Sequence, residues 1–216
     1  MDWTPLHELT ERFTLSNGLI GLVKEDHSGE IVSAQVWVKS GSIHETDRLG
    51  SGLSHYLEHM VFKGTSLHTG KALSELVQSA GGSINAYTIF DRTVYYIDGP
   101  SESLSLFLEV LAELVFQASL SEVDAISEKG VIQREIDMGL DDPDRRLSEA
   151  IFSTAYREHP YRYPVIGHRS LFDSLTVNDL RSYYKSRYLP NNMVVVVVGA
   201  VNHSSARDTI AEHFGN

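Results

Sequence analysis

The chain has 216 residues, enough to bury a sizeable core, and its 18 Lys and Arg stand against 29 Asp and Glu for a formal net charge of -11. This acidic balance argues against a nucleic-acid partner, which would need a basic face. There is no cysteine, so any metal site must use histidine, carboxylate and water as ligands.

Apolar periodicity and turn residues predict the secondary structure in chain order. Asn17-Gly18 lies between two apolar stretches, which is typical of a β-hairpin. The predicted elements are a hairpin over 13–23, a strand over 31–38, a helix from 50–53 to just before 64, a helix over 69–80, strands over 83–87 and 93–97, a helix over 104–115, a helix from 121 past 136 that residues 141–144 interrupt, helices over 145–156 and 176–188, a strand over 193–198 and a helix over 204–214. Strands and helices mix without strict alternation, so the expected fold class is α+β, a sheet covered by helices on one side.

The segment His55-Tyr56-Leu57-Glu58-His59 carries a pattern with metal chemistry. Positions i, i+3 and i+4 of a helix share one face, so His55, Glu58 and His59 point the same way. Two such histidines can bind one metal ion at about 2.0–2.1 Å, and the carboxylate between them can take a proton from metal-bound water. This is the inverted zinc signature H-x-x-E-H. The alternative is an amphipathic helix with a solvated face, and the zinc interpretation needs a third ligand.

The third ligand is expected to be a carboxylate on another helix. Glu128 and Glu135 lie seven residues apart, so they return to within about 20° of the same direction and could both face the site. The local sequence leaves an alternative open, because Lys129 and Arg134 offer these glutamates ordinary salt-bridge partners on a solvated face.

Several segments together resemble a known family. Residues 52–65, GLSHYLEHMVFKGT, resemble the active-site segment of the pitrilysin or insulinase family of zinc peptidases, which includes mitochondrial processing peptidase and insulin-degrading enzyme. Glu135 follows His59 by 76 positions, as the family's second glutamate does. Further matching segments are 82–88 with 92–96, 159–161 with 164–167, and 183–184 with 190–193 and the valine strand. The resemblance spans nearly the whole chain.

The resemblance implies a role for each motif residue. It makes His55, His59 and Glu135 the ligands of a Zn²⁺ ion, and Glu58 the general base that acts on zinc-bound water.

Three further residues take roles from the same resemblance. Glu128 is expected to support the site by orienting a ligand. Asn85 and Ala86 are expected to form the substrate-binding edge strand, along which a peptide lies antiparallel. The alternative for Asn85 is that it caps a turn.

The resemblance also implies a fold and an activity. The expected fold is a mixed, largely antiparallel sheet covered by helices, a two-layer sandwich like the processing-peptidase domain. The expected activity is that of a zinc-dependent metalloendopeptidase that hydrolyses unfolded or short polypeptides. The alternative is a non-catalytic scaffold or partner-binding subunit of the same fold, although such members generally lack motif residues that are intact here.

The family resemblance also implies an organisation larger than this chain. Residues 1–216 are predicted to be a single catalytic zinc-peptidase domain, the first half of a two-domain clamshell. A second domain of the same fold, in cis or in a partner subunit, is expected to supply an Arg and a Tyr, so the isolated domain is expected to be weakly active or inactive. A dimer is among the assemblies that this allows.

Two segments bear on location. Residues 1–10 lack the basic and apolar regions of a secretory signal, so a cytoplasmic location is expected, with export of a longer parent left open. The most apolar run, Met193 to Val201, is too short to span a bilayer.

Overall fold

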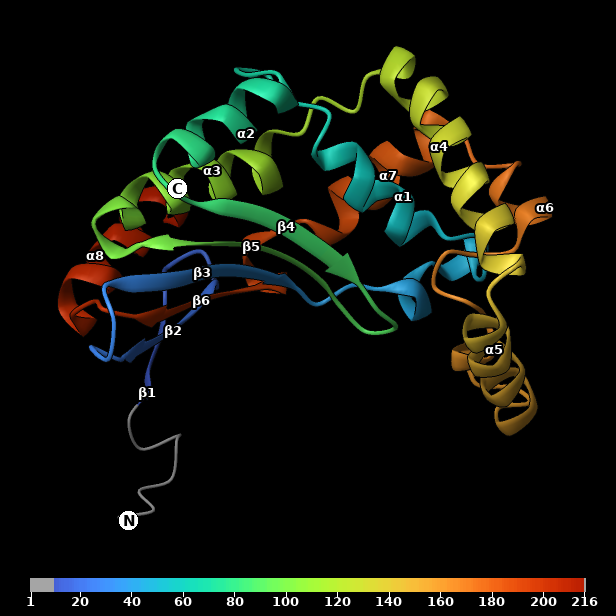
Figure 1. The fold of residues 1–216 in the computed structure, drawn as a ribbon, viewed down its shortest axis with the longest axis horizontal. Helices are drawn as coiled ribbons and strands as arrows, with labels where there is room; N and C mark the ends of the chain where they lie inside the picture. The colour runs from blue at the N-terminus through green and yellow to red at the C-terminus, as the bar shows by residue number, and fades with distance from the viewer. Residues whose placement is uncertain (1–9, 216) are drawn as a thin grey trace.

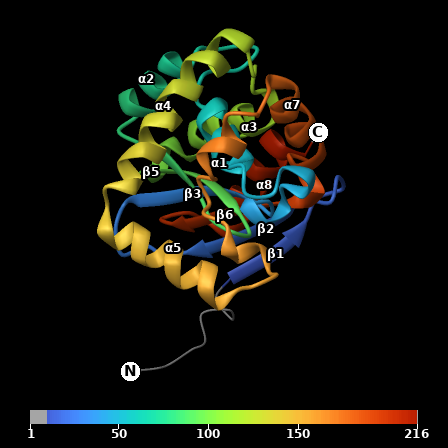
Figure 2. The same cartoon turned by 90° about the vertical axis from the view of Figure 1, so that its right-hand side faces the viewer.

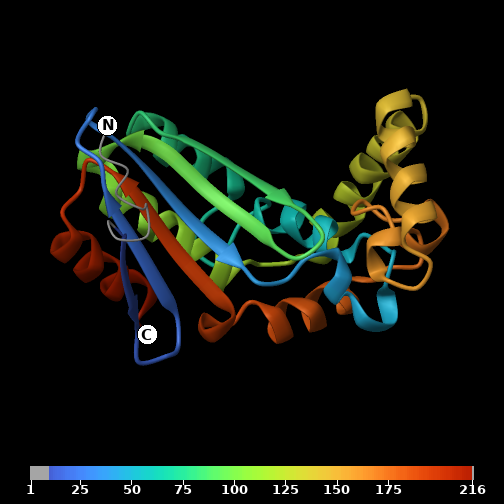
Figure 3. The same cartoon turned by 90° about the horizontal axis from the view of Figure 1, so that it is seen from below.

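The computed structural model describes residues 10–215, and within them six strands form one sheet with helices packed on one face (Figures 1 and 3). The strands are β1 (Thr10–Thr14), β2 (Ile20–Glu25), β3 (Ile31–Val38), β4 (Ser83–Thr88), β5 (Thr93–Pro100) and β6 (Met193–Gly199). The helices are α1 (Leu53–Val61), α2 (Gly70–Ser79), α3 (Leu104–Gln117), α4 (Glu122–Leu140), α5 (Pro143–Ala155), α6 (Arg169–Phe172), α7 (Val177–Arg187) and α8 (His203–Phe214). None of the described helices has the length and apolar character needed to cross a bilayer. Of the segment tested for a secretory signal, residues 1–9 lie outside the described part of the chain.

The sheet has the strand order β1-β2-β6-β3-β5-β4. Only the β2–β6 pair is parallel among the described pairs, so the predicted mixed, largely antiparallel α+β fold is confirmed. The valine strand β6 lies in the interior of the sheet. Met193, Val195 and Val197 are fully buried and the valines between them are half-buried, as the two-residue period of a strand requires. Strand β4 lies at one edge.

The helices divide into two groups. Helices α2, α3 and α8 cover one face of the sheet, and α3 supplies much of the core through an apolar stripe at three- and four-residue steps (Figure 1). Helices α4, α5 and α6 lie past the end of the sheet, beyond the β4–β5 hairpin (Figures 1 and 2). Helix α1 lies between the two groups, where it packs against both β4 and α4.

The predicted elements are all present, with several boundaries shifted by up to three residues and one α-helix that was not predicted. Helix α5 begins at Pro143 rather than at residue 145, because the Asp142 side chain accepts hydrogen bonds from the backbone N–H groups of Asp144 and Arg145 at 3.0 and 3.2 Å. Proline fits the first turn of a helix, where no backbone N–H is needed. The additional helix is α6, whose four residues are too few for a periodic pattern.

The start of α1 is fixed by a carboxylate from outside the helix. The residue that precedes the helix is Gly52, with φ 76° and no side chain to cap the first turn. Glu45 takes that role, accepting hydrogen bonds from the backbone N–H groups of Gly52 and Ser54 at 3.2 and 2.9 Å. A Cβ atom at position 52 would lie 2.0 Å from the carbonyl oxygen of Ile166. The hydrogen bonds to Glu45 and the close packing of Gly52 against Ile166 together hold the first turn of α1 in place.

Glu45 predicts a pH-dependent contribution to stability. It is only 1% exposed, and burial raises its pKa to about 7 from the usual 4.5. A pKa raised in the folded state contributes stability that is fully present below pH 4.5 and is lost as the pH rises through about 7. Relative to Glu45→Gln, the metal-free wild type should therefore lose roughly 2–3 kcal/mol of unfolding free energy between about pH 5 and 8. Urea denaturation at several pH values measures this.

The exposed Glu30 offers the matched control. Glu30→Gln should follow the wild type at every pH. The same pH dependence in the wild type and in Glu45→Gln would contradict the prediction.

Candidate metal centre

Helix α1 brings the two histidines of the motif together. The ring centroids of His55 and His59 are 4.6 Å apart, and both rings are half-buried between α1 and α4. The hydroxyl of Tyr56 donates a 2.6 Å hydrogen bond to the carbonyl oxygen of Ala125, which ties α1 to the first turns of α4. Ile132 and Ile136 of α4 are also buried, and their burial further stabilises the packing of α4.

Helix α4 places the predicted carboxylate at the same point. Oε2 of Glu135 lies 3.8 Å from Nε2 of His55 and 3.8 Å from Nε2 of His59. One ligand atom from each of the three residues lies within 4.8 Å of the others. These distances are too long for hydrogen bonds, so the three atoms surround a common point without bonding one another. Ligands about 2.1 Å from a tetrahedral zinc ion lie about 3.4 Å apart, and the donor set of two imidazoles and one carboxylate fits that ion.

The protonation state of His55 and the hydrogen bond of His59 suit metal binding. Burial lowers the pKa of His55 to about 3, with the neighbouring His59 and Arg145 adding to the effect, so His55 is neutral at pH 7. Nδ1 of His59 lies 2.8 Å from Oε1 of Glu128, which leaves Nε2 of His59 free to bind a metal. Nδ1 of His55 is buried without a hydrogen-bond partner among the described residues. Neutral imidazole is the form that binds metal ions.

Glu128 is a buried carboxylate that bonds to two neighbours, Lys63 and His59. Its side chain is 6% exposed, and it pairs with Lys63 at the end of α1 as well as with His59. Burial alone would raise the pKa of Glu128, but the hydrogen bonds from Lys63 and His59 outweigh burial and lower it. The alternative in which Lys129 pairs with these glutamates is wrong, because Lys129 donates instead to the carbonyl oxygens of Asp173 and Leu175 at 2.7 and 2.9 Å.

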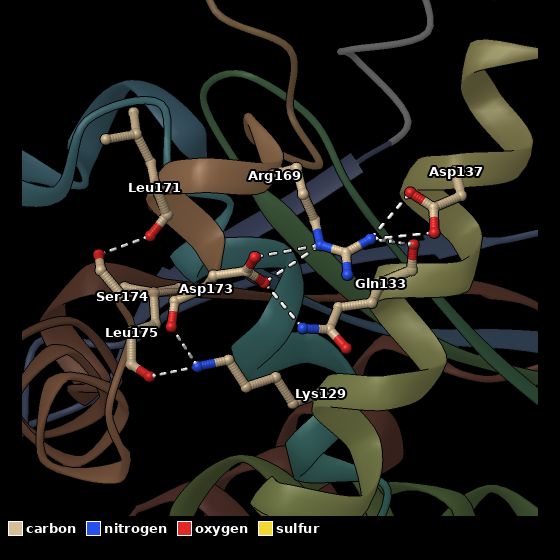
Figure 4. A network of polar contacts seen from close by, with 8 residues as sticks. All are labelled: Lys129, Gln133, Asp137, Arg169, Leu171, Asp173, Ser174 and Leu175. Atoms are coloured by element: carbon tan, nitrogen blue, oxygen red, sulfur yellow. Dashed lines mark hydrogen bonds and ion pairs between the residues drawn. The ribbon is translucent and has the colours of Figure 1, made fainter.

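A polar network anchors one face of α4 to α6 and the turn after it (Figure 4). Its members on α4 recur every four residues and therefore share one face of the helix. They bond to α6 and the turn after it; the pairs are Lys129 with Asp173 and Leu175, Gln133 with Asp173, and Asp137 with Arg169, which also bonds Asp173. Because this face is held against α6, the face that carries Glu128 and Glu135 is turned toward α1.

Glu58 lies beside the three converging residues but is not one of them. It is 9% exposed, and the hydroxyl of Thr88 donates a hydrogen bond to its Oε2. Burial raises the pKa of Glu58, and the hydrogen bond from Thr88 opposes the rise. Glu58 is therefore a buried carboxyl group with one side-chain donor, next to a candidate metal site.

The predicted substrate strand is the edge strand β4. Among the described residues β4 pairs with β5 alone. Asn85 is exposed, and its Oδ1 accepts a 2.8 Å hydrogen bond from the backbone N–H of Ala86. That N–H therefore faces away from β5, and by alternation the backbone groups of Ile84 and Thr88 do so too. Asn85 bonds within its own strand rather than capping a turn.

Sequence reasoning left three residues at this site without a role there. Thr88 was part of the family match, and the two-residue period from Ile84 and Ala86 could have placed its side chain on the face toward α1. Lys63 was part of the family match over 52–65, and its pairing with Glu128 was not predicted. Glu45 lies outside the helix that it caps, and no local pattern in the sequence indicates that contact.

The fold and the site define a class of protein. An α+β domain with an inverted zinc signature on one helix and a converging carboxylate on another is typical of zinc-dependent hydrolases. The family model for insulinase, peptidase family M16, matches residues 22–169, and the chain belongs to this family. A second model, described as the peptidase M16 inactive domain, matches residues 174–216, which contain none of the motif residues.

Relatives of known sequence are named as proteases. The chain is 32% identical over 208 residues to the uncharacterized zinc protease YmxG of Bacillus subtilis, covering 96% of this chain and 50% of that protein. It is also 32% identical over 201 residues to the probable β subunit of the mitochondrial-processing peptidase of Arabidopsis thaliana, covering 93% of this chain and 38% of that protein. The family is thus one of zinc proteases, and the chain spans about half the length of these relatives or less.

Solved structures share the fold. A protease from Helicobacter pylori superimposes with a TM-score of 0.91 at 31% identity, covering 96% of this chain and 50% of that chain. The first half of the periplasmic protease PqqL from Escherichia coli gives a TM-score of 0.88 at 27% identity, covering 99% of this chain and 47% of that chain. The predicted likeness to the processing-peptidase family is therefore confirmed.

Replacing Glu135 tests the role predicted for it as a ligand. Glu135→Gln removes the negative charge while keeping the side chain's size, so zinc should bind more weakly by more than the 10- to 100-fold that is usual for residues that only orient a ligand. Competition with a chelator measures the zinc dissociation constant. Unchanged zinc affinity would contradict the assignment.

Replacing Glu128 tests whether it orients His59. Glu128→Gln should lower zinc affinity by about 10- to 100-fold, because the amide holds the His59 ring less firmly than the carboxylate does. Glu122→Gln, at an exposed position on the same helix, is the control and should bind zinc as the wild type does. Equal zinc affinity in the two variants would show that Glu128 does not support the site.

Proposed function

We propose that this chain is the catalytic domain of a zinc-dependent endopeptidase that hydrolyses peptide bonds in unfolded or short polypeptides. The observation that carries the proposal is the convergence of His55, His59 and Glu135 beside the buried carboxyl group of Glu58. In this proposal the three converging residues hold the zinc ion. When bound there, zinc acts as a Lewis acid that lowers the pKa of water and polarises the peptide carbonyl.

The proposed substrate site is the open edge of β4. An extended peptide can add to an exposed sheet edge through main-chain hydrogen bonds. The backbone of Ala86 is available there once the Asn85 side chain releases its N–H. Because such contacts read the backbone rather than the side chains, broad sequence tolerance follows. A folded protein keeps most of its backbone groups paired within its own structure, which is the reason for proposing unfolded or short substrates.

Glu58 is proposed as the general acid and base. It takes a proton from the attacking water at a carboxylate oxygen and then delivers a proton to the amine that leaves. This kind of transfer contributes roughly 10²–10⁴ in rate. Burial favours the protonated carboxyl group that this cycle passes through, and the Thr88 hydroxyl holds one carboxyl oxygen in place.

The working protein is proposed to be larger than this chain. The relatives named above are about twice as long or longer, and one of them is a subunit of a processing peptidase. We propose that a second domain of the same fold, in cis or in a partner subunit, closes over β4 and completes the substrate site. The isolated domain would then bind zinc but cleave peptides weakly.

Replacing Glu58 tests the proposal. In the chain of native length, Glu58→Gln should keep its zinc content and lose about 10²–10⁴ in the rate of cleavage of a quenched peptide, because the amide cannot accept the proton. Glu75→Gln, at an exposed position on α2, should cleave as the wild type does. Full turnover by Glu58→Gln would remove Glu58 from the mechanism.

A further inference from the structure

Thr88 joins the open edge of the sheet to the candidate catalytic carboxyl group. Its hydroxyl donates a hydrogen bond to Oε2 of Glu58 on α1. Its backbone N–H and C=O face away from β5, since they alternate with those of Tyr87 and match those of Ala86. One residue therefore presents its main chain where a peptide would add and its side chain to Glu58.

A second hydroxyl, that of Thr93 on the neighbouring strand, lies close to the Thr88 hydroxyl. Oγ1 of Thr88 lies 3.3 Å from Oγ1 of Thr93, its partner in the β4–β5 register. Thr93 is 1% exposed and donates its own proton to the carbonyl oxygen of Ser40 at 3.0 Å. Thr93 can therefore only accept from Thr88. The carboxylate of Glu58 is the stronger acceptor, so the single hydroxyl proton of Thr88 goes to Glu58.

The conformation of Thr88 is restricted. Threonine is branched at Cβ, which limits the χ1 angles open to it, and Thr88 is the last residue of β4 before the hairpin turn. The backbone N–H of the next residue, Ile89, donates a 2.9 Å hydrogen bond to the carbonyl oxygen of Arg92, which closes that turn. A side chain held in this way can fix the direction of the Glu58 carboxylate.

We propose that Thr88 is a positioning residue that aligns the Glu58 carboxylate with a peptide added to β4. The inference rests on the function proposed above, and it names the residue that links the proposed substrate strand β4 to the proposed general base Glu58. A peptide bonded to the main chain at Thr88 has its register fixed by the same residue that orients the proton acceptor. Proton transfer depends steeply on such alignment, since a misplacement of about 1 Å can cost about 100-fold in rate.

The experiment compares Thr88→Val with Thr88→Ser in the zinc-loaded chain of native length. Thr88→Val keeps the shape and β-branching but removes the donor, so kcat for a quenched peptide should fall by about 10- to 100-fold while KM stays within about twofold. Thr88→Ser keeps the donor and should restore kcat to within about threefold of the wild type. Thr14→Val, at an exposed threonine on the opposite edge strand β1, is the control and should match the wild type.

A binding measurement separates alignment of Glu58 from a direct effect on the peptide. In the Glu58→Gln background, adding Thr88→Val should leave the dissociation constant of the same peptide within about twofold, because the main-chain edge is unchanged. The zinc dissociation constant should be unchanged as well. A tenfold rise in either constant would overturn the proposal, since Thr88 would then act on the peptide or on the metal site.

The remaining outcomes also test the role proposed for Thr88. Full kcat in Thr88→Val, or a kcat in Thr88→Ser as low as in Thr88→Val, would overturn the inference. If Thr88→Val does not fold, Thr88→Ala against Thr88→Ser makes the same comparison of a missing and a retained donor. Turnover by Glu58→Gln would remove the proposed function itself, whereas an inactive Glu58→Gln beside an unimpaired Thr88→Val would remove only the inference.

Discussion

The packing of α1 against α4 is the constraint on which the site depends. Neither helix holds all three candidate ligands, so the site exists only while the packing of α4 keeps Glu135 beside both imidazoles, 3.8 Å from each in this structure. Helix α4 is secured by two neighbours, by the hydrogen bond from Tyr56 of α1 and by the polar network with α6 (Figure 4). Ligand geometry of this kind tolerates errors of only about 0.5 Å, so the anchoring of α4 matters as much as the ligands.

Three carboxyl groups around α1 are buried, and their surroundings do not all shift the pKa in the same direction. Glu45 and Glu58 have raised pKa values because burial outweighs their hydrogen-bond donors. Glu128 is also buried, but Lys63 and His59 together outweigh burial, so it stays ionised. Burying carboxyl groups costs free energy unless partners compensate. Glu128, which has the Lys63 cation beside it, is suited to orienting a histidine. Glu58, whose one side-chain donor among the described residues is the Thr88 hydroxyl, is suited to accepting a proton.

Most of the fold was predictable because its signals are local. The Asn17-Gly18 turn, the continuous valine run of β6 and the capped start of α7 at Thr176 each specify an element from adjacent residues. The motif spacing likewise put His55, Glu58 and His59 on one face. The local sequence could not choose between a solvated face and a metal site for Glu128 and Glu135, because that depends on which helix packs opposite. The resemblance to a family supplied that choice, whereas the contact of Glu45 with the start of α1 comes from tertiary packing alone.

If a peptide binds along β4 as proposed, the edge strand limits where that peptide can be cut. Main-chain hydrogen bonding repeats every two residues, so a peptide on β4 can shift only in steps of about 6.8 Å without losing its pairing. A single such step exceeds the reach of a carboxylate held by one hydroxyl group. Only one pairing register therefore brings a given peptide carbonyl to Glu58, at the end of the strand where Thr88 lies. Binding at this edge can thus tolerate many substrate side chains and still fix which peptide bond lies beside Glu58.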